Sequence, residues 1–448
     1  MLSDPIAALA TPPGRSALAI VRLSGRGVFA VAQRVVQGFR TEPARIATLA
    51  TFRAPDGAPI DRGLYIAFPA PASYTGEDMV ELSCHGGLSV PARLLTALQA
   101  AGARPAHPGE FTRRAVLNGK LDLVQAEAVG DLIDATTPAQ SRAALGQLEG
   151  GLSRRLQELR DDLVQLQALL GYDIDFPGED DGPVSPARIA GALDEAARQV
   201  GRLLATGPWG ERLREGALVV LAGRPNAGKS SLFNALLGSE RALVTEIPGT
   251  TRDAIEAPAD FLGWPVRLVD TAGLQVAADR IERLGIEVSR RYLAAADLVL
   301  LCAEAGRPLG QDETTVVDGR PGLVVRTKVD LAPASPGELA VSCVSGAGLD
   351  VLRRAVAERI FGDRASLADL EPALTRERHR DALARARAAL EDTRPHLGSE
   401  GDAVLVAHHV RRATLALDEL VGAVDVEEVL ARVFASFCVG KYEVRSKK

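Results

Sequence analysis

The segment Gly223-Arg-Pro-Asn-Ala-Gly-Lys-Ser230 constrains the fold of this chain more than any other feature. It follows an apolar strand-like run, Ala217–Ala222, and it precedes a helix-like run that ends at Leu237. Glycines in such a loop let backbone N–H groups converge on phosphate oxygens, and the helix N-terminus adds partial positive charge. The segment therefore predicts a phosphate-binding loop between a buried strand and a helix, as in nucleotide-binding α/β domains.

Two pairs of residues complete the predicted phosphate and magnesium site. Lys229 can reach the terminal phosphates, and the Ser230 hydroxyl can ligate magnesium. Further along, Pro265-Val-Arg-Leu-Val-Asp-Thr-Ala-Gly273 reads as a buried strand that delivers Asp270 to the magnesium shell. The N–H of Gly273 can then bind the γ-phosphate. This order indicates a nucleoside triphosphate, rather than an isolated phosphate, as the ligand.

A threonine pair between these motifs predicts a sensor of the γ-phosphate. In Gly249-Thr-Thr-Arg-Asp253, Thr251 is the candidate ligand of the magnesium ion, and Thr250 is the candidate for the neighbouring position. A threonine that closes over the metal and the γ-phosphate is held only while that phosphate is present. The segment therefore predicts a switch between the triphosphate and diphosphate states.

The base site is predicted by Gly322-Leu-Val-Val-Arg-Thr-Lys-Val-Asp330. A carboxylate such as Asp330 can accept two hydrogen bonds from guanine, whereas adenine would leave it unpaired, so the site should select GTP. The segment Val341–Ser345 can frame the base. The order of the motifs resembles the translation-factor-like GTPases, with two departures. Thr327 replaces a more usual Asn, which predicts a weaker bridge to the phosphate loop, and Val344 replaces a common Lys, which predicts looser base packing.

The catalytic group for hydrolysis must come from outside the usual position. Many GTPases place a Gln directly after the Asp-x-x-Gly motif, but this chain has Leu274, which cannot polarise water. Glu282, in the polar stretch 279–287, is the candidate for positioning the attacking water; a solvated helix charge is the alternative. Asn226 is placed to hold a monovalent cation beside the β- and γ-phosphates, with oxygens from 245–250 completing its shell.

Composition limits the class of protein. The 448 residues predict two to four domains, and the net charge of −6 excludes a strongly basic nucleic-acid binder, so any RNA contact should be local or shared. The cysteines, Cys84, Cys302, Cys343 and Cys438, show neither metal spacing nor a disulfide framework, which suits a reducing cytoplasm. We expect no signal peptide and no bilayer-spanning segment.

Periodicity predicts a multidomain chain. Mixed strand-like and helical runs fill the N-terminal part, and leucines from Leu145 to Leu170 recur at intervals of three and four, which indicates one long amphipathic helix. A second helix is expected over 186–205, and Thr206–Glu211 as a linker. The expected domains are 1–118, 119–212, 216–362 and 370–441. The simplest architecture is an α+β N-terminal domain and a helical bundle that contains an inserted Ras-like P-loop α/β domain.

Five further segments narrow the choice of protein family. They are Ala10-Thr-Pro-Pro-Gly-Arg15, the run from Tyr74 to Gly87, Pro108-Gly-Glu-Phe-Thr-Arg-Arg-Ala115, the run from Asn118 to Glu127, and Phe437-Cys-Val-Gly-Lys441. Together with the nucleotide motifs they closely resemble the MnmE (TrmE) tRNA-modification GTPases, over nearly the whole chain. The resemblance implies a folate-binding N-terminal domain that forms a homodimer, and a GTPase switch relayed through the helical domain.

The resemblance also implies a function and partners. With the flavoprotein MnmG, in a heterotetramer or larger assembly, the family adds an aminomethyl-type or carboxymethylaminomethyl group to the wobble uridine of certain tRNAs. A tetrahydrofolate derivative is the implied one-carbon donor, glycine or ammonia the implied amine, and potassium the implied activator of the GTPase. Contact with tRNA is expected to be shared with the partner, and no membrane is involved.

Site residues follow from matching the family motifs. Glu282, Asn226 and Asp270 are implied as catalytic, Ser230 and Thr251 as magnesium ligands, and Asn226, Thr245, Ile247 and Thr250 as the potassium shell. Arg22, Glu81, Lys120 and Lys441 are implied as folate contacts. Cys438 has either a chemical role or that of a buried helix-end thiol. The implied contacts with GTP or GDP are Asn226, Ala227, Gly228, Lys229, Ser230, Ser231, Thr245, Glu246, Ile247, Pro248, Gly249, Thr250, Thr251, Asp270, Thr271, Ala272, Gly273, Thr327, Lys328, Val329, Asp330, Ser342, Cys343 and Val344.

The sequence departs from the family pattern at two places, and two alternative functions stay open. Gln275 stands where the family often has Arg, and the tail 442–448 extends beyond the usual terminal Lys. An RNA-binding ribosome-assembly GTPase would explain the nucleotide motifs but not the four folate residues, and it predicts a basic appendage. A dynamin-like membrane GTPase would need a basic amphipathic face or an apolar anchor, and the sequence shows neither.

Overall fold

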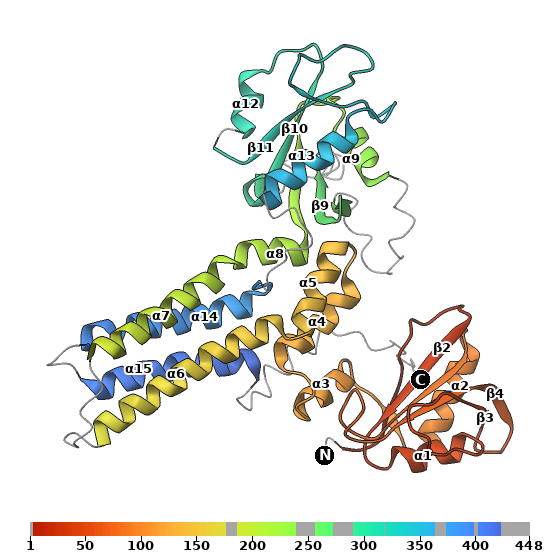
Figure 1. Cartoon of the computed structure of the whole chain (residues 1–448). Helices are drawn as coiled ribbons and strands as arrows, with labels where there is room; N and C mark the ends of the chain where they lie inside the picture. Colours follow the sequence, from red (N-terminus) through yellow and green to blue (C-terminus); the bar gives the residue numbers. More distant parts are fainter. Residues whose placement is uncertain are drawn as a thin grey trace, which may run out of the picture. The chain divides into compact units, whose positions relative to one another are not determined.

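The computed structural model describes residues 3–175, 186–238, 256–271, 290–317, 319–362, 373–397 and 402–422 (Figure 1). The chain divides into two compact units. The first contains residues 1–130 and 418–448, and the second contains residues 131–417. Among the described helices, none is long and apolar enough to cross a membrane.

The first unit is built on a six-stranded mixed sheet with the strand order β3-β4-β5-β2-β1-β6. The strands are β1 (Ile6–Leu9), β2 (Leu18–Ser24), β3 (Thr48–Arg53), β4 (Pro59–Phe68), β5 (Met79–His85) and β6 (Arg104–Pro105). The pairs are antiparallel except for β1 and β6. The helices are α1 (Val28–Val35), α2 (Ser89–Ala100), α3 (Glu110–Leu117) and α4 (Leu123–Asp134), and α4 continues into the second unit.

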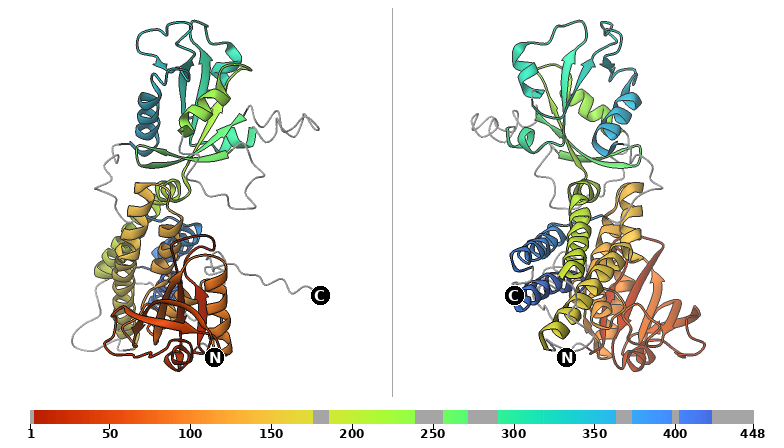
Figure 2. Two further views of the ribbon diagram at one scale, coloured as in Figure 1. Left: turned by 90° about the vertical axis from the view of Figure 1, so that its right-hand side faces the viewer. Right: turned by 60° about the vertical axis from the view of Figure 1, so that its left-hand side comes forward.

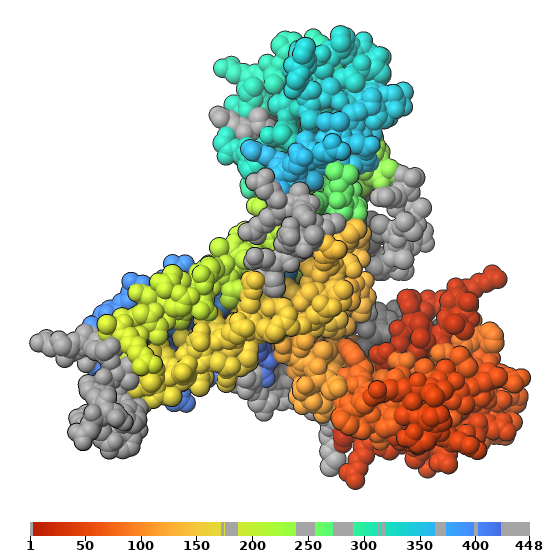
Figure 3. Space-filling model, viewed as in Figure 1, coloured from red at the N-terminus to blue at the C-terminus, as the bar shows by residue number. Residues whose placement is uncertain are grey.

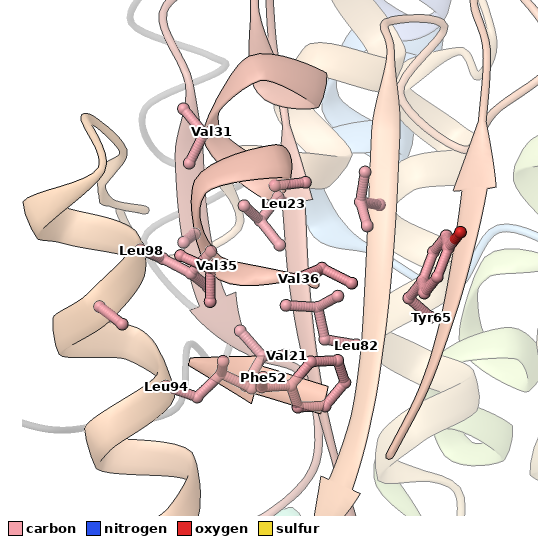
Figure 4. Packing of buried hydrophobic residues seen from close by; sticks show 14 of the residues in the cluster. Val21, Leu23, Val31, Val35, Val36, Phe52, Tyr65, Leu82, Leu94 and Leu98 are labelled. Atoms are coloured by element: carbon pink, nitrogen blue, oxygen red, sulfur yellow. The ribbon is translucent and has the colours of Figure 1, made fainter. Parts of the chain in front are cut away.

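Buried and partly exposed side chains alternate along the strands, so this sheet has one buried face and one more open face. Val21 and Leu23 of β2 and Leu82 of β5 are buried, while the residues between them are partly exposed. Figure 4 shows these side chains packed with Leu94 and Leu98 of α2. The helices therefore cover one face, and the alternate residues, including Arg22 and Glu81, lie on the other.

The second unit contains a six-stranded sheet with the strand order β12-β11-β10-β7-β9-β8. The strands are β7 (Ala217–Ala222), β8 (Glu256–Phe261), β9 (Trp264–Asp270), β10 (Leu298–Glu304), β11 (Gly322–Thr327) and β12 (Leu339–Ala340). Only β8 runs antiparallel to its neighbour. Helices α9 (Lys229–Leu237), α12 (Gln311–Val317) and α13 (Leu349–Phe361) accompany it. The continuous apolar runs of β7 and β10 are buried, as expected for central parallel strands.

The remaining helices of the second unit form a bundle. They are α5 (Pro138–Leu148), α6 (Gly151–Asp175), α7 (Pro186–Ala205), α8 (Gly207–Glu215), α14 (Glu377–Glu391) and α15 (Ala403–Val421), with a short 3-10 turn, η4 (Arg394–His396). Figure 2 shows the α6–α7 part beside the α14–α15 part, although these segments are far apart in the sequence. Figure 3 shows α6 and α7 lying directly against each other. The sheet of the second unit is thus inserted between two halves of one helical domain.

The prediction of one long leucine-striped helix is wrong at its start. Six leucines of α6, from Leu152 to Leu170, are buried, but Leu145 belongs to α5 and is 45% exposed. The helix is interrupted between α5 and α6 because Gly150 adopts a left-handed φ of 83° after α5 ends. The α5 helix begins instead with a capping box between Thr137 and Gln140.

The predicted linker Thr206–Glu211 is also wrong, because Gly207–Glu215 is the helix α8. A proline near its first turn is compatible with a helix, since that N–H would have no partner within the helix. The α8 helix ends at Gly216, whose φ of 86° turns the chain into β7. The connection into β7 is therefore helical.

An apolar cluster joins α8 and α5 to the sheet of the second unit. Leu213 packs with Ala217, Trp264 and Phe361, and Trp209 lies partly buried against the same cluster. The rings of Trp264 and Phe361 stack with centroids 4.6 Å apart. The cluster therefore connects the start of β7 with the end of α13.

Candidate functional site

The phosphate loop lies between β7 and α9 and depends on unusual backbone angles. Gly223, Asn226 and Gly228 have φ values of 137°, 63° and 84°. A Cβ atom on Gly223 would lie 2.3 Å from the carbonyl oxygen of Cys302, so only glycine fits there. The predicted strand, loop and helix are all present.

Lys229 closes the loop on itself. Its Nζ donates hydrogen bonds of 2.8 Å to the carbonyl oxygens of Gly223 and of Arg224. Burial lowers the pKa of Lys229, and the nearby Cys302 and Asp270 oppose that shift. Phosphate oxygens entering the loop would replace these carbonyl oxygens as acceptors, which fits the predicted role of Lys229.

Asp270 lies where the sequence predicted it, at the end of the buried strand β9. It is paired in register with Leu221 of β7, one residue before the end of that strand. The Thr271 hydroxyl donates a 2.7 Å hydrogen bond to the Leu221 carbonyl oxygen and fixes the two strand ends together. Ser230, the hydroxyl predicted as a magnesium ligand, is exposed at the start of α9, directly after the phosphate loop.

The base loop and the phosphate loop are joined by Thr327. Its hydroxyl lies 2.8 Å from the carbonyl oxygen of Ala227 and 3.3 Å from that of Ala303. The bridge that the sequence predicted to be weaker is therefore present, made by a buried hydroxyl instead of an amide. Glycine at 228 is favoured here because its φ of 84° is left-handed.

The Asp330 carboxylate is held in position by the segment expected to frame the base. The Ser342 hydroxyl donates a 2.7 Å hydrogen bond to Asp330 Oδ1, and the N–H groups of Val344 and Ser345 bind the same hydroxyl oxygen. Val344, where the sequence predicts looser base packing, is 86% exposed. Cys343 beside it has a pKa raised by burial.

Sequence reasoning missed two ion pairs around the nucleotide site. Lys328, whose φ is 59°, places its Nζ 3.2 Å from Glu304. Arg224 of the phosphate loop lies 3.5 Å from the buried Glu313 of α12. Lys328 and Arg224 both stand within recognised motifs, but nothing in their spacing identifies the partners.

Several predicted site residues lie outside the described residues. This holds for the threonine pair predicted as a switch, for the stretch that contains Glu282 and for the C-terminal motif. They are Thr245, Glu246, Ile247, Pro248, Gly249, Thr250, Thr251, Ala272, Gly273, Leu274, Gln275, Glu282, Cys438 and Lys441.

A second cluster lies on the open face of the N-terminal sheet. Arg22 of β2 and Glu81 of β5 are direct cross-strand partners, and Arg22 donates hydrogen bonds of 2.9 and 2.7 Å to Glu81 Oε1. The guanidinium carbon of Arg22 lies 5.4 Å from the ring centroid of Tyr74 and 5.8 Å from that of Phe111. The two aromatic residues belong to motifs that the sequence singled out without assigning them a role.

The loop after Tyr74 connects this cluster to Lys120. The side chain of Lys120 packs against Gly76, and its Nζ lies 3.2 Å from the carbonyl oxygen of Pro71. Asn118 fixes the loop with a 2.7 Å bond to the Thr75 carbonyl oxygen. Burial raises the pKa of Tyr74, so its phenol stays protonated at neutral pH. Three of the four predicted folate residues thus border one loop.

Comparisons with known proteins find one family along nearly the whole chain. Residues 5–120 match the family model "GTP-binding protein TrmE N-terminus", and residues 123–438 match "MnmE helical domain". A tRNA modification GTPase MnmE from Akkermansia muciniphila is 41% identical, over 98% of this chain and all of that protein. Those from Methylorubrum populi and Thermus thermophilus are 47% and 44% identical, over 96% and 98% of this chain and 96% and 100% of theirs.

These matches extend over both the nucleotide site and the N-terminal cluster, and they cover nearly the full length of each relative. The GTP-hydrolysing activity predicted from the phosphate loop and the base loop is that of these relatives. The chain therefore belongs to the MnmE family of tRNA modification GTPases.

Proposed function

We propose that this GTPase is activated by potassium and works with the flavoprotein MnmG on the wobble uridine of certain tRNAs, in the cytoplasm. The reaction adds an aminomethyl-type or carboxymethylaminomethyl group, with a tetrahydrofolate derivative as the one-carbon donor. One observation carries the proposal: the same chain holds a guanine-nucleotide site and, on a separate sheet, the Arg22–Glu81 pair flanked by Tyr74 and Phe111.

The nucleotide site supplies the switch. Ser230 and Asp270 would hold magnesium, which neutralises charge on the β- and γ-phosphates when bound. Lys229 exchanges its loop carbonyl partners for phosphate oxygens, and Asp330 orients guanine through its bond to Ser342. Asn226, exposed in the loop with a left-handed φ, is free of the α9 helix and suits a cation ligand.

Replacing potassium with sodium at constant ionic strength should lower GTP turnover about tenfold or more, because a cation beside the phosphates replaces the charge of an arginine finger. The Asn226→Ala variant should turn over slowly in both salts, since it lacks the amide oxygen that holds the ion. Steady-state phosphate release measures both effects, with GDP affinity as the control for an intact loop. Equal wild-type rates in the two salts would refute potassium activation.

The N-terminal cluster fits a folate. Both hydrogen bonds from Arg22 end on Oε1 of Glu81, so Oε2 is placed to accept from the N–H groups of a pterin. Tyr74 and Phe111 offer ring faces beside it. Residues 1–130 contain thirteen Lys and Arg against ten Asp and Glu, in a chain whose net charge is −6. This local positive balance, with Lys120 exposed, favours the anionic glutamate tail.

The Glu81→Gln variant should bind a tetrahydrofolate derivative about tenfold or more weakly, because it loses a charged acceptor for the pterin. Equilibrium dialysis of the full-length protein measures the affinity. Ser83→Ala is the matched control, two residues along the same strand, and it should bind normally. GTP turnover should be unchanged in both variants. Normal folate binding by Glu81→Gln would place the folate elsewhere.

We propose a homodimer, an assembly with MnmG and a tRNA contact shared with that partner. The open face of the N-terminal sheet supports the dimer, because Leu49 and Leu64 are cross-strand partners and are 56% and 42% exposed. Sedimentation of the Leu49→Ser/Leu64→Ser double variant should show monomers where the wild type shows dimers. An unchanged sedimentation coefficient would exclude this face.

Mass spectrometry of tRNA nucleosides from cells that lack this protein tests the whole proposal. The modified wobble uridine should disappear, and it should return with the intact gene but not with Asp270→Ala, because the buried carboxylate is needed for the magnesium site. Unchanged nucleosides would favour the alternative, a GTPase of ribosome assembly, whose loss would instead change the ribosomal particle profile.

A further inference from the structure

The chain passes between the helical domain and the GTPase part twice, through two connecting segments that we call the crossings. The two crossings meet beside one acidic residue. The chain enters the GTPase part through α8 and Gly216, and after α13 its described path resumes at Ala373. Asp131 lies at the end of α4, far from both crossings in sequence. We infer that Asp131 is a positioning residue that couples the nucleotide state to the helical domain by binding both crossings at once.

The contacts of Asp131 are specific. Its Oδ1 accepts a hydrogen bond of 3.2 Å from Arg214 Nε, at the end of α8, and one of 2.6 Å from Arg376 at the start of α14. The side chains of Asp131, Arg214 and Arg376 are 16%, 32% and 22% exposed. One oxygen atom therefore links the incoming and the outgoing chain in a partly buried site, where ion pairs are less screened than on the surface.

Neighbouring bonds hold the same two crossings. Gln140 of α5 donates a 2.8 Å hydrogen bond to the Arg214 carbonyl oxygen, and Gln147 donates one of 2.9 Å to the Ala373 carbonyl oxygen. A Cβ atom on Gly210 of α8 would lie 2.2 Å from the Leu374 carbonyl oxygen, so the two segments touch through their backbones. Hydrogen bonds thus connect both crossings to α5, and close backbone contact connects the crossings to each other.

The site also has space for rearrangement. A cavity of about 150 Å³ is lined by Asp131, Asp134, Gln140, Gln147, Arg214 and Thr375. A displacement of α8 is transmitted directly to the phosphate loop, because β7 starts at Ala217 and ends at Ala222, next to Gly223. The Asp131 ion pairs can shift within the cavity while they keep α8 and α14 moving together. This coupling deepens the proposed function, on which its effect on tRNA rests.

Hydrogen–deuterium exchange of the full-length protein tests the coupling independently of tRNA. In the wild type, amides of α5 and α14 should exchange differently with GDP and with a non-hydrolysable GTP analogue. Asp131→Asn should remove that difference, while GTP turnover stays within about twofold of wild type. Modified wobble uridine should fall about tenfold, within the usual range of coupling energies. Asp134→Asn, which lines the same cavity, is the matched control and should behave as wild type.

Two results would overturn the inference. One is a nucleotide-dependent exchange difference that survives in Asp131→Asn. The other is a loss of GTP turnover equal to the loss of modification, which would make Asp131 a support of the nucleotide site. If Asp131→Asn melts early, Arg214→Gln and Arg376→Gln replace it; each removes one side of the bridge, and both should uncouple. If wild-type cells lack the modified uridine, the proposed function fails while the exchange result still decides the coupling.

Discussion

The Asp330→Asn variant is expected to lose GTP binding by about 100-fold or more and to prefer xanthosine triphosphate instead. Guanine presents two N–H donors to the carboxylate. In the variant the asparagine carbonyl can accept from one of them, but the asparagine NH2 group faces the other, so that donor is buried without an acceptor. Xanthine carries a carbonyl in place of the guanine amino group, so the amide N–H finds an acceptor. Ser342 already fixes the side chain at this position through Oδ1.

Competition binding with a fluorescent guanine nucleotide, followed by turnover with both triphosphates, measures this change of specificity. Ser342→Ala is the control for the geometry of the carboxylate. It should weaken GTP binding modestly without any gain for the xanthine nucleotide, because the charge is retained and only its orientation is released. If Asp330→Asn still prefers GTP, the base is bound by other residues.

The Arg114→Ala variant is expected to destabilise the N-terminal unit by about 3–5 kcal/mol, because it removes the buried guanidinium that pairs with Glu110 and Glu77. The Arg114 side chain is 1% exposed and lies 2.9 Å from Glu110, 3.1 Å from Glu77 and 3.1 Å from Asp4. Arg104 provides a second cation, 2.6 Å from both Glu110 and Asp4. Removing the central guanidinium breaks one interaction with Asp4 near the start of the chain, one with Glu77 before β5, and one within α3.

The same network makes the stability of this unit depend on pH. Burial alone would raise the pKa of Glu110, but hydrogen bonds from Arg104, the His107 N–H and Arg114 outweigh it and lower the pKa to about 2. The carboxylate therefore contributes stability fully above its unfolded pKa of 4.5, of the order of 3 kcal/mol. That contribution should be lost as the pH falls from about 4.5 towards 2.

Native-state hydrogen exchange is the suitable measurement, because both tryptophans lie outside this unit and ordinary fluorescence would not report on it. Amides of β2 and β5 should lose protection in Arg114→Ala, whereas those of β7 and β10 should not. Arg93→Ala, an exposed arginine on α2, should change the opening free energy by no more than about 0.5 kcal/mol. Equal protection in the two variants would show that the network is not stabilising.

The positions of residues that depend on the local backbone conformation were predictable from the sequence. The phosphate loop needs glycine and a strand-to-helix turn in a fixed order, so Lys229 and Asp270 were placed correctly. The inserted architecture followed from helical patterns on both sides of the GTPase motifs. The error over α5 and α6 arose because Gly150 interrupts a leucine periodicity that continues across the break.

Residues that act through tertiary contacts were not predictable. Asp131 and Arg376 are 245 residues apart, and neither belongs to a motif with a mechanism. Thr327 looked like a weaker substitute because its residue type was judged without its surroundings; in the structure the short hydroxyl reaches Ala227 directly. Tyr74 and Phe111 stood in recognised segments, but only the fold brings both rings to Arg22.

The stacked Trp264–Phe361 pair has a practical consequence. The chain contains two tryptophans, and both belong to the apolar cluster that joins α8 to the GTPase sheet. Indole emission shifts in wavelength and intensity when its surroundings become more or less polar. Rapid mixing with GTP in a stopped-flow fluorimeter can therefore time the movement of this one junction in the unlabelled protein, and comparison with phosphate release gives the order of the two events.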